Sequence, residues 1–204
     1  MDDFLITGRT LVRYAGPGGD IVIPGGVTAI GRFTFYGRAD LTGITLPDGL
    51  SEIGVGAFQC CSGLTRISLP DSVAWIGASA FYGCTGLESV SIPEGIAAVS
   101  PYAFCCCTGL ESVSIPGSVR EIGMGAFEGC SSLTSAAVPD GVASICQYAF
   151  RDCIRLTNVS IPGSVTAIHR WAFNGCRGLT VRAPAGSYAE AYAGKHKPIS
   201  FVPV

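Results

Sequence analysis

Residues 64–84 read LTRISLPDSVAWIGASAFYGC, and residues 87–107 repeat the same pattern as LESVSIPEGIAAVSPYAFCCC, 23 positions later. Written as a consensus, the unit is L-x-x-I-x-I-P-x-x-V-x-x-I-G-x-x-A-F-x-x-C. The spacing holds along the chain without insertion or deletion, as three columns show: Pro24, Pro47, Pro70, Pro93, Pro116, Pro139 and Pro162; Phe35, Phe58, Phe81, Phe104, Phe127, Phe150 and Phe173; Cys61, Cys84, Cys107, Cys130, Cys153 and Cys176. Such a period indicates a repeat architecture.

A unit of this length cannot close a hydrophobic core of its own, so identical coils must stack and share one continuous core. The segment Ile67-Ser68-Leu69 alternates apolar and polar residues, which is typical of a half-buried strand. We therefore expect each coil to add one strand to a parallel sheet, ended by a proline such as Pro70. We expect Gly54 and Gly77 to allow a tight bend before the Ala-Phe pair.

Both ends of the stack carry segments that depart from the repeat. Residues 4–14 indicate two short strands around a turn at Gly8. Ser187, with Glu190 three residues later, forms a capping box that predicts a helix of about ten residues, and residues 199–204 predict a last strand. We predict one domain over residues 1–204, with an N-terminal β-hairpin cap (1–20), about seven repeats (21–181) and a C-terminal helix and strand cap (182–204).

The repeat resembles the BspA-like bacterial leucine-rich repeats, a 23-residue class with this consensus, over residues 21–181. The resemblance implies a right-handed, mainly β solenoid with a parallel sheet. It also implies a surface-exposed or secreted protein that binds proteins in adhesion or surface recognition. The sequence departs from the pattern at six positions, which are Thr34, Arg38, Ser100, Ala136, Cys146 and His169.

Composition excludes several classes of protein. With 204 residues, 48% of them hydrophobic and 14% charged, the chain is not disordered. The formal net charge of −2 provides no excess of positive charge that would bind nucleic acid or anionic lipid, so neither partner is expected. Apolar runs are too short to span a bilayer, so no membrane insertion is expected. No export signal follows Met1, which favours the cytoplasm if the chain is complete, whereas the family resemblance favours the cell surface.

The ten cysteines do not predict a disulfide framework. Equivalent residues in adjacent coils lie about 4.8 Å apart, beyond the roughly 3.5–4.5 Å between the Cβ atoms of a relaxed disulfide. We interpret the cysteine column as small buried hydrophobic residues. Cys60, Cys105, Cys106 and Cys146 lie outside it, and their redox state stays open. No C-x-x-C or zinc spacing occurs, so we expect no metal and no cofactor.

One pair of residues has catalytic chemistry. Cys146 and His169 are separated by one repeat period, so they occupy the same position in consecutive coils, as a nucleophilic thiol and its base would. No carboxylate or amide that would orient the histidine shares that column. We therefore predict that the protein is not an enzyme, and we keep a thiol enzyme as the second alternative.

Two surfaces are candidates for a partner. The predicted outward face of the sheet is small, hydroxylic and nearly uncharged, with residues such as Ser89, Ser91, Ser112 and Ser114. Variable positions beside the Ala-Phe pairs hold aromatic residues, which are common at binding hot spots. The predicted partner-binding residues are Trp171, Tyr148, Tyr102, Tyr82 and Trp75. The competing interpretation is that these rings only cover their own bends.

These observations predict a non-catalytic interaction module whose rigid surface binds a protein, with a glycan as the alternative ligand. The first alternative, from another class, is a structural protein that assembles by stacking coils end to end. The identity of the partner and the oligomeric state stay open.

Overall fold

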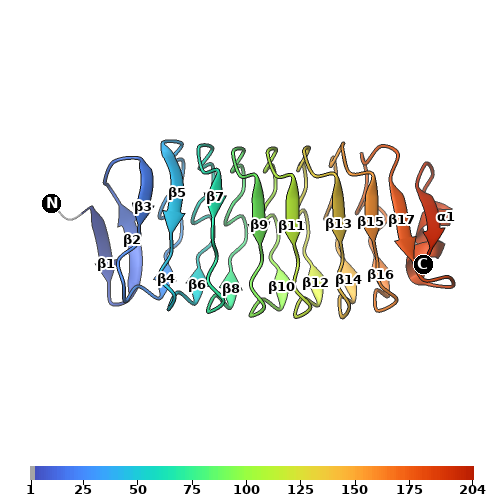
Figure 1. Ribbon diagram of the computed structural model, residues 1–204, viewed down its shortest axis with the longest axis horizontal. Coiled ribbons are helices and arrows are strands. Elements are labelled where there is room, and N and C mark those ends of the chain that lie inside the picture. The colour runs from blue at the N-terminus through green and yellow to red at the C-terminus, as the bar shows by residue number, and fades with distance from the viewer. Residues whose placement is uncertain (1–2) are drawn as a thin grey trace.

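The structure is a computed structural model that describes residues 3–204. Coils stack along one axis, and the two ends of the chain lie at opposite ends of the stack (Figure 1). Strands of neighbouring coils pair in parallel with the register of the repeat, for example Val90 with Val113 and Ile122 with Ile145. The predicted solenoid with parallel strands is therefore confirmed.

Each coil contributes two strands, one more than predicted. The first row contains β3 (Gly19–Val22), β5 (Leu41–Thr45), β7 (Arg66–Ile67), β9 (Ser89–Ser91), β11 (Ser112–Ser114), β13 (Ser135–Ala137), β15 (Asn158–Ser160), β17 (Thr180–Ala183) and β18 (Ser200–Pro203). The second row contains β2 (Thr10–Tyr14), β4 (Ala29–Ile30), β6 (Glu52–Ile53), β8 (Trp75–Ile76), β10 (Ala98–Val99), β12 (Glu121–Ile122), β14 (Ser144–Ile145) and β16 (Ala167–Ile168). Sequence does not reveal the second row because its strands after β2 are too short for an alternating pattern.

The third side of each coil is a series of turns around the Ala-Phe pair. Backbone hydrogen bonds link these turns from coil to coil, as from the Phe81 N–H to the Ala103 carbonyl oxygen at 2.8 Å. The phenylalanine rings of the repeat form an interior stack with neighbouring centroids 5.1–5.5 Å apart. Phe81 and Phe104 are therefore immediate neighbours, as the stacking hypothesis requires.

The glycines that were predicted to allow a tight bend have a different role. Gly54 and Gly77 are not among the residues with positive φ. Instead, a Cβ atom on Gly54 would lie 2.8 Å from the carbonyl oxygen of Ile30, so glycine is needed here for close approach between coils. The bends with positive φ come later, at two columns of the turn side that include Tyr102 (56°) and Cys106 (59°).

Both predicted caps are present. At the N-terminal end, β1 (Phe4–Thr7) pairs antiparallel with β2. At the C-terminal end, α1 (Tyr188–Lys195) begins after Ser187, whose hydroxyl accepts a hydrogen bond from the Glu190 N–H at 3.3 Å. The helix has eight residues, slightly fewer than predicted, and β18 follows it.

The two departures in the first coil bind the N-terminal cap. The Thr34 hydroxyl donates to the Leu11 carbonyl oxygen at 3.1 Å. Arg38 donates to both carboxylate oxygens of Asp40, at 2.8 and 2.9 Å, and to the carbonyl oxygen of Gly16. These polar side chains replace the usual alanine and cysteine because the neighbouring layer is a hairpin and not another coil.

Candidate functional site

The five predicted partner-binding residues do not form one patch. Trp75 lies in β8, in the second row of strands, and 43% of its surface is exposed. Tyr82, Tyr102, Tyr148 and Trp171 lie on the turn side, beside the Ala-Phe pairs. Only Tyr148 and Trp171 contact each other as aromatic rings among these five.

Tyr148 and Trp171 form a parallel aromatic pair in neighbouring coils. Their ring centroids lie 5.6 Å apart and the ring planes differ by 10°. The Arg170 guanidinium lies 4.1 Å from the Trp171 ring centroid, and that of Arg151 lies 4.9 Å from the Tyr148 ring centroid. Both rings are half-buried, and each has a guanidinium over it, so the pair combines apolar surface with positive charge.

Tyr102 and Phe33 fit the packing interpretation better. A Cβ atom on Gly125 would lie 2.4 Å from the Tyr102 ring, and one on Gly56 would lie 2.2 Å from the Phe33 ring. Each ring therefore covers a glycine in the next coil. Tyr82 lies against Cys106, and the negative charge of the ionised Cys106 sulfur, together with its hydrogen bond, raises the pKa of Tyr82.

The structure does not form the thiol–imidazole pair. No hydrogen bond joins Cys146 to His169 within residues 3–204, and the His169 Nδ1 atom accepts from the Trp171 N–H at 3.2 Å. Burial and the nearby Glu121 carboxylate raise the pKa of Cys146, which disfavours the reactive thiolate. All ten cysteines are free thiols.

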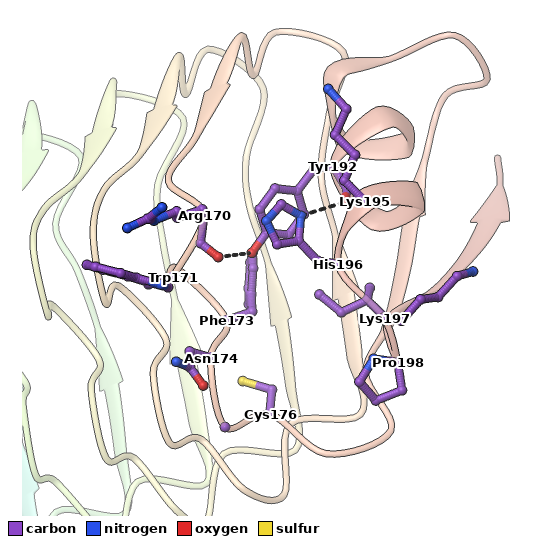
Figure 2. Close-up of a pocket in the computed structure, with 12 residues that line it drawn as sticks. Arg170, Trp171, Phe173, Asn174, Cys176, Tyr192, Lys195, His196, Lys197 and Pro198 are labelled. Atoms are coloured by element: carbon purple, nitrogen blue, oxygen red, sulfur yellow. Dashed lines mark hydrogen bonds between the residues drawn. The ribbon is translucent and has the colours of Figure 1, made fainter.

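A recess at the C-terminal end was not predicted. It lies where the last full coil meets α1 and consists of two adjoining cavities of about 360 and 390 Å³ that share Arg170, Tyr192, Lys195 and His196. Trp171, Lys197 and Pro198 line the first cavity. Figure 2 shows the side chains arranged around it. We call these two cavities together the C-terminal cleft.

Hydrogen bonds and ring stacking fix the inner wall of the cleft. The Tyr192 hydroxyl donates to the Arg170 carbonyl oxygen at 3.3 Å, and burial raises the pKa of Tyr192 to about 12. The His196 ring stacks on the Tyr192 ring at 4.1 Å between centroids. His196 Nδ1 lies 2.8 Å from the Tyr192 carbonyl oxygen, which only accepts, so Nδ1 donates (Figure 2).

The electrostatics of the cleft follow from the charge distribution along the chain. Residues 40–150 contain two basic and ten acidic residues, whereas residues 151–204 contain seven basic and two acidic residues. All charged residues that line the cleft are basic: Arg170, Lys195 and Lys197. A count of charged residues by segment shows that the C-terminal end is basic. The net charge of the whole chain does not show this, because the acidic residues of 40–150 offset the basic residues.

Two other kinds of site are absent from the part of the chain that the structure describes. No three His, Cys, Asp or Glu side chains gather as a metal site would require. None of its helices has both the length and the apolar character needed to cross a bilayer.

Comparison with known proteins identifies the repeat. The family model described as the BspA type leucine rich repeat region matches residues 18–134 and 53–180. The search of curated proteins found no match.

Solved structures agree with this family. A leucine-rich repeat protein of T. pallidum is 29% identical with a TM-score of 0.79, over 96% of this chain and 91% of that one. A leucine-rich repeat protein of Eubacterium ventriosum is 28% identical with a TM-score of 0.78, over 83% of this chain and 46% of that one. A leucine-rich cell surface protein of Faecalibacterium prausnitzii is 25% identical with a TM-score of 0.59, over 85% of this chain and 61% of that one.

Proposed function

This chain belongs to the BspA-type leucine-rich repeat family, and from that premise we propose that it is a non-catalytic interaction module that binds a protein partner through the turn side of its last coils. The observation that carries the proposal is the stacked pair Tyr148 and Trp171, with the guanidinium of Arg151 over the Tyr148 ring and that of Arg170 over the Trp171 ring. Tyr, Trp and Arg are the residues most enriched in binding hot spots.

The surroundings of the pair support this role. The two rings are attached to turns that are hydrogen-bonded from coil to coil, with the Phe150 N–H donating to the Ala172 carbonyl oxygen at 2.8 Å. The rings are therefore held in place before any partner arrives, and little conformational entropy is lost on binding. The similarity to a cell surface protein of F. prausnitzii supports surface recognition as the setting.

The experiment compares three forms of the full chain: wild type, the double variant Tyr148→Ala/Trp171→Ala, and the control Trp75→Ala on the second row of strands. Proteins captured by wild type are identified by mass spectrometry, and each is then purified for titration calorimetry. We expect the double variant to bind at least tenfold more weakly and the control to bind like wild type. Equal binding by wild type and the double variant would overturn the proposed surface. If no purified protein binds with saturation, the interaction role itself fails.

One observation favours the second candidate, a self-assembling scaffold. Apolar side chains are exposed at the N-terminal end of the stack, with Leu5 on β1 at 56% and Val22 on β3 at 67% exposure. Both strands lie at the end of their sheets and offer an open edge to another chain. Light scattering across a range of concentrations distinguishes the two candidates, because a strict monomer excludes assembly.

A further inference from the structure

Two thiols, those of Cys105 and Cys106, lie side by side on the turn side of one coil. Their sulfur atoms are 3.6 Å apart, and Cys105 is buried whereas Cys106 is half-buried. At the position of Cys106 the other repeats have glycine, apart from Cys60 and Asp152, and at the position of Cys105 none of them has cysteine. The repeat therefore requires cysteine at neither position, and its packing does not explain the pair.

The backbone holds the two thiols in place. The Cys106 N–H donates to the Glu128 carbonyl oxygen in the next coil at 2.7 Å, and the Cys105 N–H donates to the Tyr102 carbonyl oxygen at 3.1 Å. Cys106 has a positive φ of 59°, and Cys60 in the same column has one of 61°. Because the turn is already fixed, a ligand that bridges both sulfur atoms costs little conformational entropy of the chain.

A disulfide between these two neighbours is disfavoured. Consecutive Cα atoms lie about 3.8 Å apart across a trans peptide bond, which is less than the roughly 4.4–6.8 Å that relaxed disulfides span. Forming the disulfide would strain the turn. An atom that bonds to both sulfur atoms does not require them to approach each other to bonding distance, so the pair suits a bridging ligand better than a disulfide.

The distance between the sulfur atoms selects the geometry of the bridging atom. With bonds of about 2.3 Å to each sulfur, as for zinc, a separation of 3.6 Å gives an angle of about 103° at the bound atom. A linear centre such as two-coordinate Cu(I) would need sulfur atoms about 4.6 Å apart with the same bonds. The pair therefore fits an atom with angular bonds, which is either a tetrahedral cation or a pyramidal trivalent metalloid.

The number of ligands and their charge decide between these two. Zinc sites have three or four protein ligands, and within residues 3–204 no group of three His, Cys, Asp or Glu side chains forms such a site. Zinc would also need both sulfur atoms as thiolates. Burial raises the pKa of Cys105, and the neighbouring Cys106 and Glu128 raise it further. A trivalent arsenical needs only two sulfur ligands and reacts with neutral thiols.

We propose that Cys105 and Cys106 form a dithiol site that binds a trivalent arsenical, with the arsenic atom bridging the two sulfur atoms. For an arsonous acid, R–As(OH)₂, both As–O bonds break and two As–S bonds form, and the two thiol protons leave with the hydroxides as two molecules of water. Arsenic stays trivalent, no oxidant or reductant takes part, and no charge is buried. Tyr82, which lies against Cys106, provides an apolar wall for the organic group R. The inference goes beyond the proposed function because it assigns a small ligand to a separate site.

The test is titration of the reduced full chain with phenylarsine oxide, which is phenylarsonous acid in water, by calorimetry and by intact mass spectrometry under native conditions. We expect one phenylarsenic group per chain in place of two hydrogen atoms, and we expect ethanedithiol to remove it. Cys106→Gly should weaken binding about a hundredfold or more, because a single thiol cannot chelate the arsenic. This substitution introduces the glycine that most other repeats have there, so the turn is preserved.

The matched control is Cys60→Gly, the same substitution in the same column, where Gln59 takes the place of the buried thiol. Cys60 is followed by Cys61, but that thiol is buried and donates to the Phe35 carbonyl oxygen at 3.0 Å. Cys60→Gly should therefore change the affinity less than twofold. Circular dichroism should show all variants folded.

Several outcomes would overturn the proposal. These are absence of the adduct in wild type, an equal loss in Cys60→Gly, and unchanged binding in Cys106→Gly or in Cys105→Ser. Saturable binding of zinc that Cys106→Gly abolishes would assign the pair to a metal cation and overturn the arsenical. Because these variants leave Tyr148 and Trp171 intact, two and three coils further along the stack, protein capture and arsenical binding can fail independently.

Discussion

The Cys107 thiol donates a hydrogen bond to the carbonyl oxygen of Phe81, one coil earlier, with 3.1 Å between sulfur and oxygen. The same bond, at 3.0–3.2 Å, recurs at every cysteine of the column. The predicted burial of this column is confirmed, but the interpretation as merely small hydrophobic residues was incomplete. Cysteine fits because it is small, apolar and still satisfies a buried carbonyl group.

The cysteine column predicts a loss of stability at alkaline pH. Burial raises the pKa of Cys107 to about 12, whereas the pKa of a thiol in the unfolded chain is about 8.5. Above the lower value the unfolded state releases protons that the folded state retains, so the free energy of unfolding falls as pH rises toward the folded pKa. Each such thiol contributes a slope of about 1.4 kcal/mol per pH unit in this window.

Urea unfolding between pH 7 and 10.5, with a reductant present, measures this slope. We expect a plateau below the pKa of the unfolded thiols and a steep decline above it. Cys107→Ala should make the decline shallower by the contribution of one thiol, about 1.4 kcal/mol per pH unit. The control substitution is Cys60→Ala, because Cys60 is half-buried and lies outside the column. An unchanged slope in Cys107→Ala would contradict the explanation.

The close approach at Gly54 predicts that a single methyl group is destabilising. In Gly54→Ala the new Cβ atom would meet backbone atoms of Ile30 and Gly31 at 2.8 Å, and backbone cannot move aside as a flexible side chain can. We expect a cost of about 1–3 kcal/mol, as for other overpacked sites. Chemical denaturation measures it.

Ser100 is the matched control, since it occupies the same column in another coil and its hydroxyl donates to the Ile76 carbonyl oxygen. Ser100→Ala should lose only that hydrogen bond, about 1 kcal/mol. If Gly54→Ala is as stable as wild type, glycine in this column has a role other than close approach.

The phenylalanine stack predicts the largest loss among single substitutions. Phe104 is fully buried and its ring centroid lies 5.3 Å from that of Phe81 and 5.5 Å from that of Phe127. Phe104→Ala should lower the free energy of unfolding by about 3–5 kcal/mol, because neighbouring coils cannot collapse into the space. The control is Phe33→Ala, because 46% of the Phe33 surface is exposed, and it should lower the free energy of unfolding by clearly less. Equal losses would mean that the stack is not the core.

Much of the fold could be predicted because the same local environment recurs in every repeat. The columns of Leu64 and Phe81 fix which side chains face inward, and the C-terminal cap could be identified from the Ser187 and Glu190 pair. The role of Gly54 could not be predicted, because sequence does not distinguish a glycine needed for a bend from one needed for close approach.

The candidate site was only partly predictable. Trp171 and Tyr148 could be found because the repeat does not require aromatic residues at their positions, and the structure stacks them. The C-terminal cleft could not be found because it joins a coil to α1, and no repeat period relates Arg170 to Lys195. Where the chain leaves its period, side chains from different elements meet in ways that only the three-dimensional structure shows.

The aromatic pair allows a test that separates packing from binding. If the stacking of Tyr148 on Trp171 stabilises the fold, a double-mutant cycle with alanine should give a coupling energy of about 0.5–1.5 kcal/mol in urea unfolding. Tyr102 and Trp171, three coils apart with no ring contact, should give a coupling near zero. A coupling near zero for the stacked pair as well would mean that the contact between the two rings contributes little to stability, and that it does not explain why two aromatic residues share this column. A large coupling together with unchanged partner binding in the double variant would assign the pair to the fold alone.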